Sequence, residues 1–203
     1  MPLIVLEGID GCGKTSVALK LIEKLSSVGF PAVYTREPFN RNLVEELLAR
    51  FSGSIRDLAE VATMLIDRVL HVENVLKNLV QHYVVICDRY HYSTIAYQGA
   101  LGYDIDLLLR LVDLFPKPDL AIYLRIDVDT AMKRIASREG KISIFEERWR
   151  LERAIEIFDE LANRGYLVTV DATQPLPTVV SECAKLVLRK LRAAMLTQHG
   201  SER

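Results

Sequence analysis

Short apolar runs rich in β-branched residues alternate along the chain with longer segments in which apolar residues recur at helical spacing. Continuous apolar runs are typical of strands buried on both faces, and their alternation with helices predicts a parallel sheet covered on both sides. We therefore expect one α/β domain over residues 1–203. The expected strands are Leu3–Leu6, Ala32–Tyr34, Val84–Cys87, Leu120–Leu124 and Leu167–Val170.

The helical segments differ in length and in the signals that bound them. A helix over Thr15–Val28 is expected to end at Gly29, because glycine readily takes the left-handed conformation at a helix C-terminus. The segment Ile55–His82 keeps helical spacing over an unusually long stretch, and either one helix or two would fit it. Further helices are expected at Asp104–Leu114, Asp129–Ser137, Glu146–Asn163 and Leu176–Leu196.

Composition narrows the class of protein. The 203 residues are 50% hydrophobic, enough for a sizeable core, and 26 basic against 27 acidic residues give a net charge of -1. This balance excludes the basic footprint of sequence-independent nucleic-acid binding, so no nucleic-acid partner is expected. No apolar run reaches the roughly 18 to 20 residues that span a bilayer, and the stretch after Met1 has the pattern expected of a strand and not of a signal peptide. We expect a cytoplasmic protein with no membrane partner.

The three cysteines, Cys12, Cys87 and Cys183, are odd in number and show neither CxxC nor His-rich spacing. A disulfide framework or a zinc site is therefore not expected. Small buried thiols are the better interpretation.

The strongest chemical signal directly follows the first expected strand. It is a complete GxxxxGK[ST] motif that opens into a helix and comprises Gly8, Ile9, Asp10, Gly11, Cys12, Gly13, Lys14 and Thr15, followed by Ser16. Backbone N–H groups of such a loop and the helix N-terminus bind phosphate oxygens, Lys14 can bridge the β- and γ-phosphates, and Thr15 can ligate Mg²⁺. The guanine-reading NKxD tetrapeptide is absent, which favours ATP. The alternative is a tight glycine-rich turn with a structural role.

A second polar site stands at the end of the third expected strand, where Asp88 and Arg89 follow Val84–Cys87. Ligands in open α/β sheets bind beyond the carboxyl ends of the strands. Asp88 can hold Mg²⁺ directly or through water, and the Arg89 guanidinium can bind a second anion with two donors. A strand-end ion pair is the alternative.

Several motifs in order resemble the thymidylate kinase family, and the resemblance runs through most of the chain. They are the P-loop with Glu7 before it, Thr35-Arg36-Glu37-Pro38, the DRY…S…AYQG block over residues 88–99, and the Pro-Lys-Pro-Asp stretch at 116–119. The resemblance implies the P-loop NTPase fold, with a five-stranded parallel sheet in the order 2-3-1-4-5 and a short lid at about 138–147. It also implies Mg²⁺-dependent transfer of the γ-phosphoryl of ATP to dTMP, giving dTDP and ADP in dTTP synthesis, by a homodimer that uses the long helix.

The same resemblance gives roles to individual residues. Arg89 would hold the dTMP phosphate, Arg68 would face the carbonyl edge of thymine, and Asp10 would lie near the sugar 3′-hydroxyl and the metal. Arg36 would steer the acceptor phosphate. The base and sugar would be lined by Ser93, Thr94, Tyr97 and Gln98. Each role has an alternative. Ser93, Thr94 and Gln98 could cap the start of a helix by hydrogen-bonding to its backbone. Arg36 and Arg68 could form solvated ion pairs, and Tyr97 could pack in the core.

Two positions depart from the family pattern. Met64 stands where the family has an aromatic residue that stacks on thymine; its thioether can cover a base face with weaker or differently shaped contact, or it can fill the core. Gly11 occupies a place where some members carry arginine, so this cation must come from elsewhere. The candidates are Arg138, Arg148 and Arg150, of which we prefer Arg138 and Arg148; a solvated helix face is the alternative for each.

A phosphate monoester acceptor is ionised at neutral pH, so it needs no general base. The main barrier is the repulsion between two polyanionic substrates, and cations around the transferred phosphoryl group would neutralise its charge. We predict that Lys14 and one lid arginine stabilise the transition state while Arg89 holds the acceptor. A kinase for another nucleoside monophosphate or a deoxynucleoside, and an ATP-driven switch, stay open as alternatives. A preference for dTMP over dUMP is not predicted, because one methyl group contributes only about 1 to 3 kcal/mol.

Overall fold

The computed structural model describes residues 1–137 and 147–200. Its strands are β1 (Leu3–Glu7), β2 (Ala32–Arg36), β3 (Val84–Asp88), β4 (Leu120–Arg125) and β5 (Val168–Asp171). Within these residues they form a 5-stranded parallel sheet in the order β2-β3-β1-β4-β5. The α/β class and the strand order expected from the sequence are confirmed.

The helices follow the expected alternation, with two additions. They are α1 (Lys14–Ser27), α2 (Arg41–Ala49), α3 (Ser54–His71), α4 (Lys77–His82), α5 (His91–Ala100), α6 (Ile105–Val112), α7 (Val128–Ala136), α8 (Arg148–Asn163) and α9 (Leu176–Gly200). The long segment is continuous, because a π-helical stretch, η1 (Val72–Leu76), joins α3 to α4. Helices α2 and α5 lie outside the segments for which periodicity predicted a helix.

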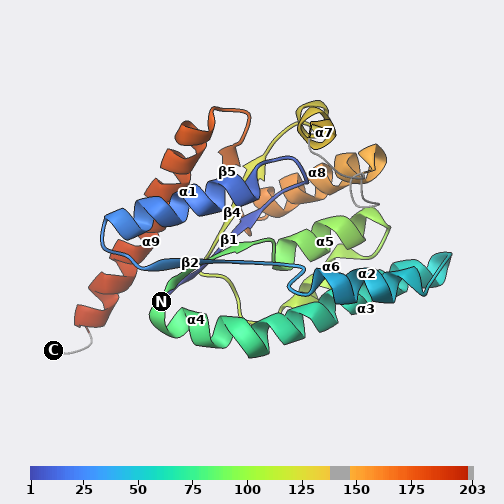
Figure 1. Ribbon diagram of the computed structural model, residues 1–203, viewed down its shortest axis with the longest axis horizontal. Helices are drawn as coiled ribbons and strands as arrows, with labels where there is room; N and C mark the ends of the chain where they lie inside the picture. Colours follow the sequence, from blue (N-terminus) through green and yellow to red (C-terminus); the bar gives the residue numbers. More distant parts are fainter. Residues whose placement is uncertain (138–146, 201–203) are drawn as a thin grey trace.

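Helices cover both faces of the sheet (Figure 1). On one side α1 contacts β1, β2 and β3, α9 contacts β4 and β5, and the two helices pack against each other. On the other side α4 contacts β3, α8 contacts β4, and α5 packs against α8. Strands β1 and β3 are buried along their whole length, which explains their continuous apolar runs. All three cysteines are free and buried, as expected.

The parallel strands bring the chemistry-bearing residues to one edge. The register pairs Leu6 of β1 and Arg36 of β2 with Asp88, the last residue of β3. The loop that leaves β1 and the segment that leaves β3 therefore lie side by side. None of the helices in the described ranges has the length and hydropathy needed to cross a membrane.

Candidate active site

The loop between β1 and α1 wraps around its own lysine. Gly8, Gly11 and Gly13 have φ angles of 137°, 81° and 94°, in the region that side chains disfavour. Lys14 begins α1 and is 6% exposed. Its Nζ donates hydrogen bonds to the carbonyl oxygens of Gly8 at 3.0 Å and Ile9 at 2.9 Å. The ammonium group thus stands over the loop, where bound phosphate oxygens would meet it. The exposed Ser16 follows in the first turn of α1.

Gly11 lies directly against helix α7. A Cβ atom at position 11 would stand 2.6 Å from the backbone oxygen of Ala131, so no side chain fits there unless α7 moves. One turn along α7, Arg134 donates hydrogen bonds to the carbonyl oxygens of Gly11 at 3.4 Å and Ala172 at 3.3 Å. Sequence analysis missed Arg134, although its spacing from Ala131 places both on one face of a helix. A cation from α7 therefore stands beside the P-loop.

Thr15 and Asp88 form an oxygen-rich pair at the mouth of the loop. The Thr15 hydroxyl donates to Asp88 Oδ2 at 2.6 Å, and the Tyr34 hydroxyl donates to the same oxygen at 3.3 Å. Burial and the Asp88 charge raise the pKa of Tyr34. No cluster of three or more His, Cys, Asp or Glu side chains suited to a metal occurs in the described residues. Two oxygen donors fit Mg²⁺, which usually takes few protein ligands and fills its octahedron with water and phosphate oxygens.

Arg89 links the end of β3 to the P-loop. It has a φ of 71°, an uncommon value outside glycine, and this turns the chain sharply after Asp88. Its Nη2 donates to Asp10 Oδ1 at 2.7 Å, and its Nη1 donates to the Gly8 carbonyl oxygen at 3.1 Å. The Tyr97 hydroxyl donates to Asp10 Oδ2 at 2.8 Å. The structure thus brings three predicted site residues, Asp10, Arg89 and Tyr97, into contact.

The charges of this group are mutually stabilised. Burial alone would raise the pKa of Asp10, but the charges of Arg89 and Lys14 outweigh burial and lower it to about 2. For Arg89, burial would lower the pKa, but Asp10 raises it well above the usual value. Burial raises the pKa of Tyr97, which stays a neutral donor. Asp10 is therefore an anion and Arg89 a cation at neutral pH.

Glu7, which ends β1 just before the P-loop, anchors the start of α5. Its Oε1 accepts hydrogen bonds from the backbone N–H groups of Tyr90 at 3.0 Å and Tyr92 at 3.1 Å, and its Oε2 accepts from the Ser93 hydroxyl at 2.5 Å. Burial raises the pKa of this fully enclosed carboxyl group. Ser93 also accepts from Arg89 Nη1 at 3.2 Å. Ser93 thereby joins the helix start to the Arg89 site. Sequence analysis named Glu7 as part of the motif before the P-loop but did not predict this role for it.

Helices α3 and α5 face each other through two polar links. Glu60, Met64 and Arg68 are spaced four apart and share one face of α3, and Thr94 and Gln98 likewise share one face of α5. Arg68 Nη2 donates to Thr94 Oγ1 at 2.8 Å, and Gln98 Nε2 donates to Glu60 Oε1 at 2.7 Å. Met64, which is half-buried, lies along α3 between these links. The residues to which the resemblance gave contact with the base therefore lie on two facing helices.

A buried donor and a buried acceptor in this region have no partner among the residues that the structure describes. They are Arg68 Nη1 and Gln98 Oε1. The rest of the Arg68 guanidinium is held by Glu37, whose Oε2 accepts from Nε at 3.0 Å and from Nη2 at 2.6 Å. An unsatisfied buried polar atom costs about 1 to 3 kcal/mol, so such atoms are typically completed by a ligand or by water.

The remaining predicted cations differ in their surroundings. Arg36 is exposed at the end of β2, and its guanidinium group makes no hydrogen bond or ion pair with any described residue. Arg148 is exposed at the start of α8 and pairs with Asp129 at 2.8 Å and Glu152 at 2.9 Å. Arg150 is 3% exposed and is bound to Glu60, so the interpretation of Arg150 as a lid cation or as part of a solvated face is wrong. Arg138 and residues 138–146 of the expected lid lie outside the described residues.

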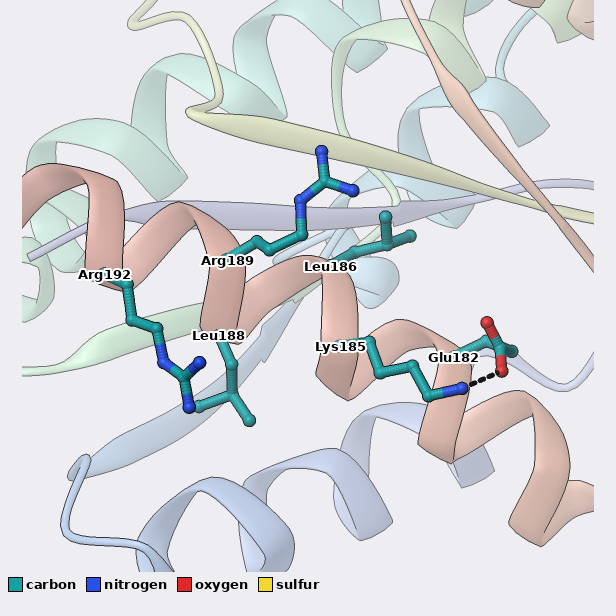
Figure 2. Close-up of a pocket in the computed structure, with 6 residues that line it drawn as sticks. All are labelled: Glu182, Lys185, Leu186, Leu188, Arg189 and Arg192. Carbon is teal, nitrogen blue, oxygen red and sulfur yellow. Dashed lines mark hydrogen bonds and ion pairs between the residues drawn. The ribbon is translucent and has the colours of Figure 1, made fainter.

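A hollow of about 460 Å³ lies along α9, well separated from these residues in the sequence (Figure 2). Its lining is Glu182, Lys185, Leu186, Leu188, Arg189 and Arg192. Lys185 is paired with Glu182 at 2.6 Å, and the side chains of Arg189 and Arg192 point away from each other. The cations do not converge, so this hollow lacks the arrangement of a phosphate site.

A P-loop that opens into α1, an acid at the end of the neighbouring strand and a parallel sheet in the order 2-3-1-4-5 together identify a P-loop NTPase fold. The thymidylate kinase family model matches residues 6–183. The chain belongs to the thymidylate kinase family.

Individual relatives match over nearly their full length. A probable thymidylate kinase of Staphylothermus marinus is 39% identical over 93% of this chain and 95% of its own. A thymidylate kinase of Brachyspira hyodysenteriae is 33% identical over 89% of this chain and 90% of its own. A probable thymidylate kinase of Archaeoglobus fulgidus is 35% identical over 91% and 94% of the two chains. The family match therefore includes the P-loop and both helices α3 and α5.

Proposed function

We propose that the chain transfers the γ-phosphoryl group of ATP to dTMP, giving ADP and dTDP. The choice of dTMP as substrate rests on two buried atoms on facing helices. Arg68 Nη1 is a hydrogen-bond donor and Gln98 Oε1 a hydrogen-bond acceptor, and neither has a partner among the described residues. Thymine presents an acceptor at O4 beside a donor at N3–H, which complements this pair. Cytosine presents an acceptor at N3 beside a donor at N4, which opposes it. The thymidylate kinase relatives support the same acceptor.

ATP is the proposed donor, bound on the P-loop. The loop N–H groups and Lys14 hold its phosphates, and Thr15 and Asp88 supply oxygen ligands for Mg²⁺. When bound there, Mg²⁺ neutralises phosphate charge. Lys14 stays next to the transferred group and stabilises the charge that develops on it.

The acceptor phosphate is proposed to lie against Arg89, with the exposed Arg36 steering it from the end of β2. The Asp10 carboxylate, already oriented by Arg89 and Tyr97, would face the 3′-hydroxyl of the sugar. The phosphate is ionised, so none of these groups has to remove a proton from the nucleophile. The remaining cation on the transferred group is proposed to be Arg138 or Arg148.

ADP formation from Mg·ATP tests this function, with dTMP, dUMP, dCMP, UMP, AMP and GMP as acceptors and a control without acceptor. We expect ADP to form rapidly with dTMP and only slowly with dCMP or without acceptor. ADP formation at the same rate with and without acceptor would instead indicate an ATPase switch, and a preference for another nucleotide would indicate a different kinase.

A homodimer is proposed from the outer face of α3. Large apolar side chains there are about half exposed at Ile55 (55%), Leu58 (53%), Ile66 (50%) and Val69 (48%). Their spacing places them along one stripe of the helix. A contiguous exposed apolar stripe is typical of an interaction surface, and a second copy of the chain would cover it by two-fold symmetry.

A further inference from the structure

The direction of the Gln98 amide is set by its neighbour on α3. Glu60 is 2% exposed, and its Oε1 accepts the hydrogen bond from Gln98 Nε2 at 2.7 Å. An ionised carboxylate accepts hydrogen bonds and has none to donate. The amide nitrogen of Gln98 therefore faces Glu60, and the amide oxygen points elsewhere. That oxygen is buried and has no partner within the described ranges.

Arg150 keeps Glu60 in this accepting role. It reaches from α8 and donates from Nη1 to Glu60 Oε2 at 3.2 Å and from Nη2 to Glu60 Oε1. The same Nη2 donates to the Tyr97 carbonyl oxygen at 3.2 Å, one residue before Gln98. A guanidinium group has no acceptor. Because both Glu60 oxygens accept from Arg150, neither is free to act as a donor toward Gln98.

We propose that the buried Glu60–Arg150 pair determines base specificity by holding the Gln98 amide oxygen toward the acceptor base. The pocket then selects a pyrimidine with N–H at position 3, thymine or uracil, and rejects cytosine, which has a lone pair there. This inference rests on the proposed function. Glu60 and Arg150 are positioning residues in this scheme, since both act through Gln98.

Glu60→Gln is the sharpest test, because it keeps the size of the side chain and adds a donor. In this variant the new amide can donate to Gln98 Oε1, so the Gln98 amide can turn over and offer its nitrogen to the base. We expect the ratio of kcat/KM for dTMP over dCMP to fall by about 10- to 100-fold, mostly through KM, with an absolute gain for dCMP. If kcat/KM fell by the same factor for dTMP and dCMP, the proposal would be overturned.

Two companion variants separate orientation from structure. Glu60→Asp keeps an acceptor without a donor, so the dTMP over dCMP ratio should stay near that of the unmodified protein even where thermal stability falls. Arg153→Met is the matched control on α8, because Arg153 is exposed and pairs only with Glu156 among the described residues. Its ratio should not change. A fall in the ratio for Glu60→Asp as large as for Glu60→Gln would contradict the orientation argument.

Glu60→Gln removes the carboxylate charge that faces the buried Arg150 guanidinium, which destabilises the fold. Glu60→Gln combined with Arg150→Met removes that charge and keeps the new donor, so it serves where the single variant does not fold by circular dichroism. The same fall in ratio is expected. If the unmodified protein does not phosphorylate dTMP, the proposed function fails; if it does and the ratio is unchanged in both folded variants, only this inference fails.

Discussion

The side chains of Thr15 and Asp88 are joined by a 2.6 Å hydrogen bond, although 73 positions separate them in the sequence. Thr15 is the last residue of the P-loop motif, and Asp88 ends the strand next to β1 in the sheet. The parallel arrangement of β1 and β3 places both at one edge, so two separate sequence signals become one set of oxygen ligands.

Asp88→Asn should weaken the use of Mg²⁺, because an amide keeps the size of the side chain but lacks the negative charge. We expect the Mg²⁺ concentration needed for half-maximal ADP formation to rise by about 10- to 100-fold. A magnesium titration at saturating ATP and dTMP measures this. Asp113→Asn, which removes an exposed carboxylate paired with Lys117, is the control and should titrate normally.

Lys14→Ala and Arg89→Ala should each lower kcat by about 10²- to 10³-fold, since each removes a cation from the reacting phosphates. Arg89→Ala should also raise the KM for dTMP, whereas Lys14→Ala should act on the ATP side. Steady-state kinetics with each substrate varied would show the difference. Lys20→Ala, on the exposed face of α1, should have normal kinetics. Near-normal turnover in either active-site variant would remove that residue from the mechanism.

Asp10 should make stability depend on pH under acidic conditions. Its pKa in the folded protein, about 2, lies below the ordinary value of 3.8, so its stabilising contribution is complete above about pH 4 and is lost as pH falls toward 2. The contribution is at most about 2 kcal/mol. Urea unfolding between pH 5 and pH 2 should show the free energies of unfolding of the wild type and Asp10→Asn converging as pH falls. A difference that does not change with pH would contradict this pairing.

Met64→Phe should tighten dTMP binding by about 2- to 10-fold, because an aromatic ring stacks on a base better than a thioether does. Its position between Arg68 and Glu60 on one face of α3 supports contact with the base. Calorimetric titration with dTMP measures the affinity. Unchanged or weaker binding would show that Met64 packs in the core and does not face the base.

The proposed dimer predicts that Leu58→Glu or Ile66→Glu yields a monomer, because a carboxylate in the middle of the apolar stripe would be buried without a partner. Sedimentation velocity over a range of protein concentrations reports the oligomeric state. Leu107→Glu, at an exposed apolar position on α6, should leave it unchanged. A wild-type protein that sediments as a monomer would refute the proposal at the outset.

Much of the fold could be read from the sequence because burial gives the strands continuous apolar runs. Helix α5 was harder to predict: most of its residues are buried, including Ser93, Thr94 and Gln98, so no polar face marks a helical period. Helix α2 is short, and its clearest signal is the Asn40 cap, whose side chain accepts from the Leu43 N–H at 3.1 Å. Hydrophobic periodicity therefore does not predict either of these two helices.

The candidate site residues Lys14, Thr15 and Arg68 were predictable from a motif or a resemblance, and their binding roles stay predictions. The supporting contacts were not predictable, because they join distant parts of the chain. Arg150 and Glu60 are 90 positions apart, and nothing in their spacing indicates that they pair. Arginine on an amphipathic helix usually faces solvent, so its burial in α8 follows only from the tertiary arrangement.

The contact between Gly11 and Ala131 limits how this active site can change by mutation. An arginine at position 11 would need both a strained backbone and a retreat of α7, because a Cβ there would stand 2.6 Å from the Ala131 oxygen. One substitution therefore cannot transfer the missing cation into the P-loop. An arginine at position 11 therefore requires a second change that moves α7 away from the P-loop. The two changes would have to arise together in evolution.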